Sequence, residues 1–158
     1  MTAAAPLRSP ADPADAARAA DIDTLARTLW GEARGEGEPG MIAVAAVILN
    51  RVRISAEHDA RYWWGTGIAG VCLAKSQFSC WNPGDPNRPK LLAVDLADRE
   101  FRLARTIAER AAAGQLEDPT YGATSYKAAD LPWPPSWGRP RLPLVTIGRH
   151  AFYDFLVE

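Results

Sequence analysis

The sequence has 158 residues, of which 47% are hydrophobic and 23% are charged, and its formal net charge at pH 7 is −1. These values are ordinary for one soluble globular domain, and they exclude a disordered chain or a long coiled coil. The near-neutral charge, without a dense block of lysine and arginine, also excludes the usual electrostatic pattern of a nucleic-acid-binding protein.

The first twenty residues are rich in Ala, Pro and Asp and contain no apolar segment of the kind that a secretory signal carries. We therefore expect a flexible N-terminal tail over residues 1–20 and one domain over residues 21–158. The longest apolar stretch, residues 41–49, is about half as long as a membrane-spanning helix. We expect a monomer that does not insert into membranes.

Residues 21–34 have the spacing of an amphipathic helix, with Asp21 or Asp23 as the expected N-cap. One face of this helix is apolar and contains Ile22, Leu25, Ala26, Leu29 and Ala33. Glu32 projects into this face, where a carboxylate must be paired, face a cavity or have a raised pKa. A raised pKa is what a general acid requires near neutral pH. The alternatives are a salt bridge to Arg51 or Arg149, or an acid at the helix end that reaches water.

A glycine-rich turn and a second, strongly apolar helix follow, from Pro39 to about Ser55. The first two turns of this helix are apolar on every side, which predicts a central core helix. Glu36 and Glu38 lie at its start, where acids complement the helix dipole, and we expect them to form a solvated turn and cap. The two helices then form a hairpin with Glu32 at its mouth.

Cys72 and Cys80 lie eight residues apart. The spacing allows two buried free thiols, or a disulfide that closes a short loop in an oxidising compartment. A structural zinc site would need both His58 and His150 in addition, so we expect no metal.

Many aromatic side chains lie in loops rich in Gly and Pro rather than on a periodic face. Loop aromatics usually anchor a loop to the core. However, six tryptophans in 158 residues are more than anchoring requires. Flat aromatic faces around a cleft would suit sugar rings, which present C–H surfaces for stacking.

Residues 91–113 have the clearest pattern of an amphipathic helix, and Gly114 is expected to end it. We expect its inward-facing residues to be Leu92, Leu96, Leu103 and Ile107. Residues 120–128 and 144–157 carry the β-branched and aromatic residues of strands, and a proline-rich loop separates them. A small antiparallel sheet beside helices gives an α+β fold.

Four segments together resemble a known family. They are ARTLWGEARGEGEPGMIAVAAVILNRV, VCLAKSQFSCWN, GATSY and IGRHAFY. They are similar to the catalytic domain of the SleB/CwlJ-type cell-wall hydrolases, which include the spore cortex-lytic enzymes and their phage and proteobacterial relatives. The resemblance covers about residues 22–155 and implies a lysozyme-like, mainly helical α+β domain. It also implies cleavage of peptidoglycan between N-acetylmuramic acid and N-acetylglucosamine, without a metal or cofactor.

On this resemblance Glu32, the first glutamate of EARGE, is the single acid and base of a lytic transglycosylase that leaves 1,6-anhydro ends. The resemblance also implies a glycan groove lined by Gln77, Ser79, Trp81, Tyr126 and Trp133. We expect His150 to pack behind the sheet. Relatives often have GATHYH where this chain has GATSYK, so Ser125 and Lys127 replace two histidines.

Three further functions remain open from the sequence. Asp85 or Asp130 would supply the second carboxylate of a hydrolytic muramidase. An amidase that cuts the stem peptide would ordinarily need zinc, and a glycan-binding module would have no activity. Without an evident signal peptide, we expect synthesis in the cytoplasm and action in the periplasm or cell wall, as an endolysin released through a holin or within a phage-like particle.

Overall fold

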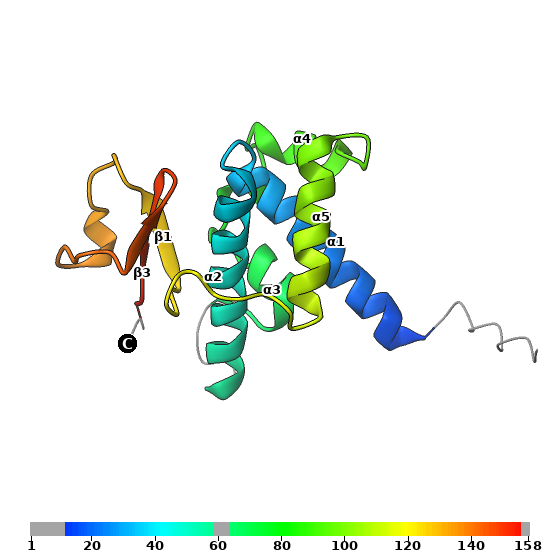
Figure 1. The fold of residues 1–158 in the computed structure, drawn as a ribbon, viewed down its shortest axis with the longest axis horizontal. Helices are drawn as coiled ribbons and strands as arrows, with labels where there is room; N and C mark the ends of the chain where they lie inside the picture. The colour runs from blue at the N-terminus through cyan, green and yellow to red at the C-terminus, as the bar shows by residue number, and fades with distance from the viewer. Residues whose placement is uncertain (1–11, 59–63, 156–158) are drawn as a thin grey trace, which may run out of the picture.

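Two long helices, α1 (Pro13–Ala33) and α2 (Gly37–Glu57), form the centre of the fold (Figure 1). The structure is a computed structural model that describes residues 12–58 and 64–155. α2 is the predicted core helix, and its Met41, Val44 and Ile48 are fully buried. Among the described residues, α2 alone is long and apolar enough to cross a membrane, but 67% of that stretch is buried inside the domain. Such burial is typical of a core helix.

α1 begins earlier than the sequence predicts. Asp12 accepts a hydrogen bond from the Ala14 N–H at 3.0 Å, and Pro13 occupies the first helical position. Residues 13–20, which the sequence pattern places in the tail, are therefore helical, and their side chains are exposed. Residues 1–11 of the expected tail lie outside the described residues.

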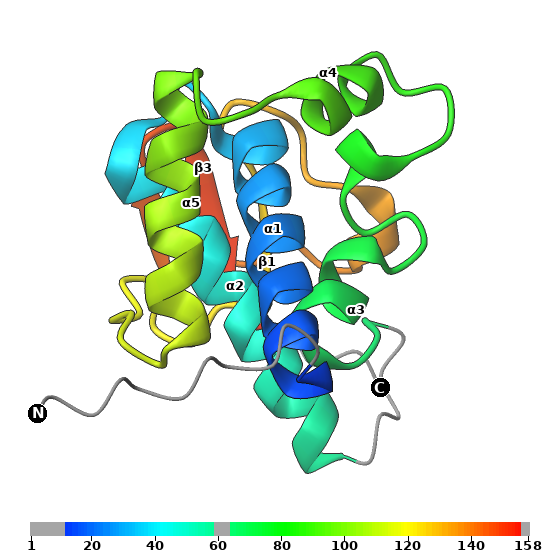
Figure 2. The ribbon, with the colours of Figure 1, turned by 90° about the vertical axis from the view of Figure 1, so that its right-hand side faces the viewer.

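Shorter helices pack around this pair, namely α3 (Gly67–Leu73), η1 (Ser79–Trp81), α4 (Asn87–Ala93) and α5 (Arg99–Ala112). α5 lies alongside α1 and α2 (Figure 2), and the core that they share contains Leu25, Leu29, Phe101 and Ile107. Burial of these apolar side chains stabilises the helical body.

The helix predicted over residues 91–113 is instead two helices, α4 and α5. α4 ends where the Arg27 guanidinium binds the carbonyls of Leu91 and Val94, at 2.5 and 3.0 Å. α5 begins at Asp98, whose carboxylate accepts the Phe101 N–H at 2.9 Å. Arg27 and Asp98 thus satisfy the backbone groups that a continuous helix would have paired internally.

This break changes which side chains reach the core. Leu92 and Leu96, which were expected to point inward, are 52% and 53% exposed, whereas Leu91 and Ile107 are buried. Gly114 follows α5 with a φ of +70°, as expected of a helix-ending glycine.

A three-stranded antiparallel sheet covers the side of α2 that faces away from α5 (Figure 1). Its strands β1 (Ser125–Ala128), β2 (Val145–Ile147) and β3 (His150–Tyr153) are arranged in the order β1-β3-β2. In the register, Phe152 of β3 lies opposite Tyr126 and Val145. The strands lie within the two segments predicted from sequence, of which residues 156 and 157 are outside the described part. The α+β prediction is confirmed.

The two faces of the sheet pack against different partners. Phe152 packs on Ala43 and Val47 of α2. The opposite face carries Tyr153 and packs against aromatic side chains around the short helix η2 (Pro135–Trp137). Since side chains alternate along a strand, the face that carries Phe152 is the face that turns toward the helices.

Candidate active site

A cleft of about 1040 Å³ lies where the helical body meets the sheet. Its lining comes from α1, α2, the loop before η1, β1 and the loop around η2. The lining residues are Glu32, Arg51, Trp64, Ser76, Gln77, Phe78, Ser79, Ser125, Tyr126, Ser136, Trp137, Gly138, Arg141 and Phe155. The cleft is large enough for several sugar rings, because pockets of about 300–1,000 Å³ hold ordinary small ligands.

Glu32 enters the cleft from the last turn of α1, and Tyr126 enters it from β1. The Tyr126 hydroxyl donates a hydrogen bond to Oε2 of Glu32 at 3.0 Å. The second oxygen, Oε1, is buried and has no hydrogen-bond partner in the described part of the chain. Within that part Glu32 forms no ion pair, and Arg149 is paired with Glu36 instead. Of the alternatives that the sequence leaves open for Glu32, the structure supports a side chain that faces a cavity and does not support a salt bridge to Arg51 or Arg149.

Tyr126 remains a hydrogen-bond donor at neutral pH. Burial raises the pKa of its hydroxyl well above the usual value, and the charge of Glu32 raises it further. A phenol that donates to a carboxylate stabilises the negative charge on that carboxylate. Tyr126 thus directs a protonated hydroxyl at the carboxyl group of Glu32.

Arg51 lines the cleft from α2, and its side chain is held on several sides. Its Nε donates to the Thr124 carbonyl at 2.7 Å, and a terminal nitrogen donates to Oε1 of Gln77 at 3.3 Å. The guanidinium carbon lies 5.6 Å from the centre of the Trp64 ring and 5.3 Å from that of Phe78. Arg51 therefore joins α2, the start of β1 and the loop before η1 at one point.

The charge of Arg51 is retained despite its burial. Desolvation lowers its pKa to about 10, and electrostatic interactions with Tyr126, Cys72 and Glu32 oppose this shift. A pKa of about 10 leaves the guanidinium protonated near neutral pH. The cleft consequently holds a fixed cation near Glu32.

Cys80 lies near Glu32, and Cys72 is buried in the same helical core. Both cysteines are free and buried, so of the two alternatives that the sequence leaves open the structure has the free thiols and not the disulfide. Burial raises the pKa of Cys72 to about 12. Burial and the charge of Glu32 also raise the pKa of Cys80. Both groups therefore remain thiols near neutral pH.

Gln77 and Ser79, two of the predicted groove residues, do line the cleft. The wall that sequence reasoning missed is formed by Trp137, Arg141 and Phe155. The Arg141 guanidinium lies over the Phe155 ring, 5.1 Å from its centre. The available signal was the proline-rich loop itself, which carries two tryptophans and two arginines close to the C-terminal strands.

Trp81 and Trp133 were predicted to line the groove, but neither does. Trp81 packs against the helical core and donates from Nε1 to Oγ1 of Thr28 at 2.9 Å. Trp133 packs edge-on against Trp137 and donates from Nε1 to the Gly138 carbonyl at 3.0 Å. Both indoles anchor loops, and Trp137 takes the position that was expected of Trp133.

His150 does not pack behind the sheet as expected. It shares with Phe152 the face that turns toward the helices, and its ring meets Tyr126 edge-on with the ring centres 5.0 Å apart. Its Nδ1 is buried and has no hydrogen-bond partner within the described ranges. His150 therefore supports the ring of Tyr126 but does not line the cleft.

The two positions where relatives often carry histidine have different roles here. Ser125 lines the cleft. Lys127 donates from Nζ to the carbonyls of Ala128 and Leu131, at 2.6 Å each. Lys127 thus holds the loop that follows β1.

Asp85 and Asp130, the candidates for a second carboxylate, do not line the cleft. Oδ1 of Asp85 accepts the Asn87 N–H at 2.8 Å at the start of α4. Asp130 is exposed in the turn after β1. Among the described residues, Glu32 is accordingly the one carboxylate that lines the cleft.

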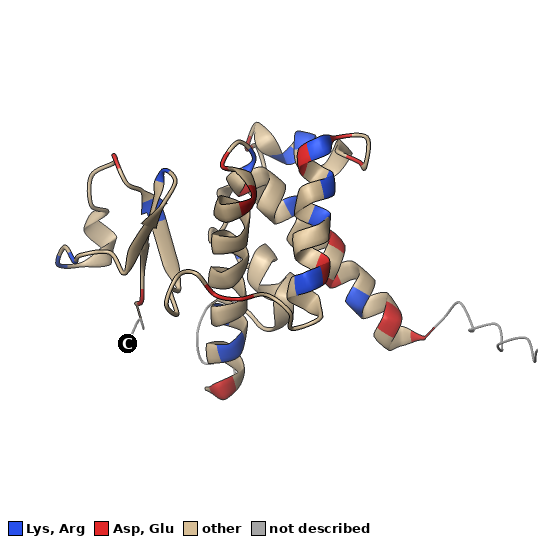
Figure 3. Ribbon diagram, viewed as in Figure 1, with Lys and Arg blue, Asp and Glu red and all other residues tan. Residues whose placement is uncertain are grey.

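Glu36 and Glu38 differ from one another, although both were expected to be solvated. Glu38 is exposed in the first turn of α2, 3.8 Å from Arg110, as predicted. The Glu36 side chain is only 12% exposed and forms an ion pair with Arg149 at 3.2 Å. The acidic turn and the basic tip of the β2–β3 hairpin can be followed in Figure 3. The prediction for Glu36 is wrong because its partner Arg149 lies 113 positions further along the chain.

The sequence matches the Cell Wall Hydrolase family over residues 35–153. It is 33% identical over 138 residues to the spore cortex-lytic enzyme of Halalkalibacterium halodurans, and 32% identical over 141 residues to that of Bacillus subtilis. These alignments cover 84% and 85% of this chain, but 34% and 37% of the two enzymes. The chain thus spans about a third of the length of these relatives.

Two solved structures share the fold. The catalytic domain of Bacillus cereus SleB superposes with a TM-score of 0.61 at 29% identity, over 85% of this chain and 89% of that domain. The catalytic domain of the germination-specific lytic transglycosylase SleB of Bacillus anthracis gives a TM-score of 0.58 at 32% identity, over 84% and 93%. With a family match over most of the chain and the SleB fold, this protein belongs to the SleB-type cell wall hydrolase family.

Proposed function

We propose that this protein cleaves the glycan strands of peptidoglycan between N-acetylmuramic acid and N-acetylglucosamine as a lytic transglycosylase. The observation that carries the proposal is the position of Glu32. Its side chain lines the cleft and accepts a hydrogen bond from Tyr126, and it is the one carboxylate in the lining among residues 12–58 and 64–155. Family membership supports a cell-wall substrate, and the name of the B. anthracis relative supports the transglycosylase reaction.

In the first step, protonated Glu32 gives its proton to the glycosidic oxygen as the bond from that oxygen to C1 of the muramyl sugar breaks. N-acetylglucosamine leaves as the alcohol with the electron pair of the broken bond, and Glu32 becomes a carboxylate. The muramyl C1 is left as an oxocarbenium-like centre, which the acetamido group of the same sugar stabilises until O6 attacks. The hydrogen bond from Tyr126 stabilises this carboxylate.

In the second step, the Glu32 carboxylate takes the proton of the muramyl 6-hydroxyl while O6 attacks C1. A C1–O6 bond forms, the product carries a 1,6-anhydro ring, and Glu32 is protonated again. No water is consumed. The substrate hydroxyl therefore does the work that a second carboxylate and water do in ordinary glycosidases.

A hydrolytic muramidase is the nearest competing function, because it would use the same cleft and the same acid. Such enzymes ordinarily place a second carboxyl group about 5–9.5 Å from the first. The positions of Asp85 and Asp130 outside the cleft lining favour the transglycosylase.

A zinc amidase and an inactive glycan-binding module have less support. A zinc amidase needs three or more metal ligands, and the described residues contain no group of three His, Cys, Asp or Glu side chains placed to hold a metal. A glycan-binding module without activity would not require a carboxyl group in the cleft that accepts a hydrogen bond from a phenol.

The experiment is digestion of purified peptidoglycan followed by mass spectrometry of the products, with and without borohydride reduction. We expect muropeptides with 1,6-anhydro ends, which borohydride does not reduce. Reducible ends would show a hydrolytic muramidase, and released stem peptides would show an amidase.

Glu32→Gln tests the role of the acid. We expect it to lower turnover by at least about a hundredfold, the ordinary contribution of a general acid, while glycan binding persists. Glu38→Gln is the matched control, because Glu38 is an exposed acid in the next helix, and it should retain full activity. Equal activity of Glu32→Gln and the parent protein would refute the proposal.

We further propose the cell wall as the site of action, reached as an endolysin reaches it. Co-expression with a holin should lyse the host, whereas expression without one should not. Lysis that is independent of the holin would contradict this route.

A further inference from the structure

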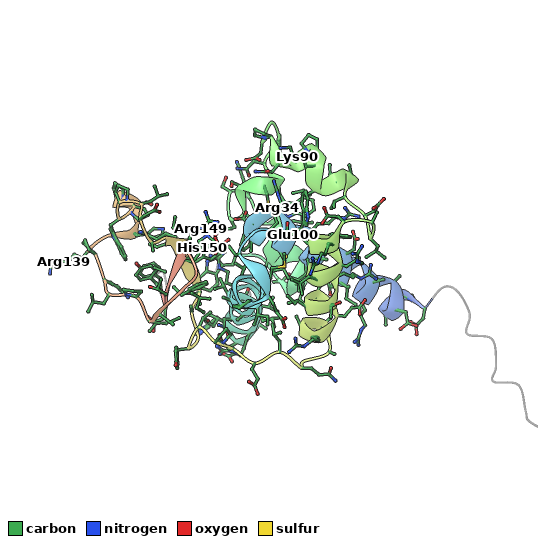
Figure 4. All side chains as sticks on the ribbon, turned by 45° about the horizontal axis from the view of Figure 1, so that its top comes forward. Arg34, Lys90, Glu100, Arg139, Arg149 and His150 are labelled. Carbon is green, nitrogen blue, oxygen red and sulfur yellow. The ribbon has the colours of Figure 1, made fainter. Side chains whose placement is uncertain are left out.

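Glu36 lies in the turn between α1 and α2, yet both of its carboxylate oxygens contact the turn between β2 and β3. Oε1 lies 3.2 Å from Nε of Arg149. Oε2 accepts a hydrogen bond from the backbone N–H of Arg149 at 3.3 Å. Arg149 comes from the hairpin and faces the helical body (Figure 4). One side chain therefore connects the segment that carries Glu32 to the sheet that carries Tyr126.

Two glycines make room for this side chain. Gly148 has a φ of +56°, and a Cβ atom built on it would overlap Oε2 of Glu36. A Cβ atom built on Gly40, one turn into α2, would overlap Cβ of Glu36. The hairpin and the helix can approach Glu36 this closely only because both positions lack a side chain.

The backbone of Glu36 is also fixed from the helical side. It lies between Gly35 and Gly37, which have φ values of +89° and +73°. The Gly35 N–H donates to Oε1 of Glu100 at 3.1 Å, which ties the turn to the first turn of α5. The turn that carries Glu36 is thus tied to α5, and the Glu36 side chain is directed at the hairpin.

The far end of the sheet has separate anchors. Asn50 donates to the Ala123 carbonyl at 2.9 Å, and Arg51 donates to the Thr124 carbonyl at 2.7 Å. Tyr126 lies between these anchors and the hairpin, and it is paired in register with Phe152 of β3. The position of the Tyr126 hydroxyl relative to Glu32 therefore depends on how both ends of the sheet are attached to the helices.

We propose that Glu36 is a positioning residue, which fixes the hairpin end of the sheet against the helices and so holds the Tyr126 hydroxyl on Glu32. The proposal rests on the proposed function, in that it takes Glu32 as the working acid. Glu36 itself does not line the cleft and acts only through β3, β1 and Tyr126.

The test is a double-mutant cycle between Glu36→Gln and Tyr126→Phe, with kcat and KM measured on soluble glycan strands. We expect Glu36→Gln to lower kcat about fivefold to twentyfold with little change in KM. In the Tyr126→Phe background the same substitution should lower kcat less than about twofold, because the hydroxyl that it positions is gone. Glu38→Gln should have no effect in either background.

An equal loss of kcat in both backgrounds would overturn the proposal, since it would show a general structural role. So would a Glu36→Gln protein with unchanged kcat. If Glu36→Gln folds poorly, Arg149→Gln provides a milder variant, because it retains the backbone N–H that binds Oε2. The smaller loss expected of Arg149→Gln should also vanish in the Tyr126→Phe background.

Hydrogen exchange separates this proposal from the proposed function. Glu36→Gln should speed amide exchange in residues 145–153 and leave exchange in α5 unchanged, whatever reaction the protein catalyses. Unchanged exchange in the hairpin would refute the positioning role of Glu36 even if the glycan products are those expected. If the parent protein released no 1,6-anhydro products, the proposed transglycosylase reaction would be refuted, but the positioning role of Glu36 would not.

Discussion

The Tyr126 hydroxyl donates a hydrogen bond to Oε2 of Glu32 at 3.0 Å, across 94 positions of sequence. This contact joins the last turn of the first helix to the first strand of the sheet. It links the two halves of the cleft directly through the proposed acid. Its geometry leads to the first prediction.

Tyr126→Phe removes the donor and leaves the ring packing against His150 and Phe152 in place. A hydrogen bond to a charged group contributes about 1.5–3 kcal/mol. We therefore expect kcat to fall about tenfold to a hundredfold, and we also expect some loss of thermal stability because Oε2 of Glu32 loses its donor. Initial rates of muropeptide release check this, and a variant with full activity would show that Glu32 does not depend on the phenol.

Arg51→Lys retains the positive charge but loses the planar group that binds Thr124 and Gln77 together. We expect a loss of about 1–3 kcal/mol in the free energy of unfolding, because buried acceptors lose their donors. Activity should fall as the loop before η1 loosens. Urea unfolding measures the stability, and Arg53→Lys is the control, since Arg53 is exposed and pairs only with Glu57 among the described residues. Equal stability of the two variants would contradict this account.

Asp118 should make stability depend on pH. Its carboxylate accepts hydrogen bonds from Thr120, Asn50 and Gly122, at 2.6–3.0 Å. Burial opposes ionisation, but these hydrogen bonds outweigh it and lower the pKa of Asp118. A carboxyl group whose pKa is lowered by folding adds stability above its unfolded value of about 3.9. That contribution is lost as the pH falls through the folded value.

Asp118→Asn should consequently be less stable than the parent protein at pH 7, and the difference should shrink as the pH falls below about 4. Urea unfolding at a series of pH values measures this difference. Asp130→Asn, in an exposed turn, is the control. A difference that stays constant with pH would show that the Asp118 carboxylate does not carry the effect.

Cys72 and Cys80 should resist alkylation in the folded protein. Both are buried free thiols with raised pKa values, so little thiolate is present near neutral pH. We expect iodoacetamide to modify both only after unfolding, and dithiothreitol to leave the melting temperature unchanged. Intact mass spectrometry under non-reducing conditions provides the check, and a reducible species two hydrogens lighter would contradict it.

Local patterns in the sequence predicted much of the fold. Leu25, Leu29 and Ala33 lie on the buried face of α1, and the apolar run after Pro39 is the core helix. Glu32 faces a cavity, which is one of the environments that its place on the apolar stripe allowed. These features depend on neighbours three or four residues apart, which is the range over which helical periodicity carries information.

The errors share a different cause. The break after α4 depends on Arg27, which lies more than sixty residues away. Glu36 is buried by a hairpin, and Trp81 is turned inward by Thr28. The sequence pattern suggests Arg51 only as a partner for Glu32. It does not predict the contacts of Arg51 with Thr124 and Gln77, which are distant in sequence. Partners at long range decide these positions, and composition and periodicity do not encode them.

The order in which the cleft residues occur along the chain has a consequence for folding. The helices pack mainly with one another and can form early. Tyr126 lies on β1, so its hydroxyl can reach Glu32 only after the sheet has formed. Contacts between such distant segments form slowly, because a long loop must close first. During translation or refolding, enzymatic activity should therefore appear later than helical structure. We expect the docking of the β2–β3 hairpin on α2 to be the step that completes the active site.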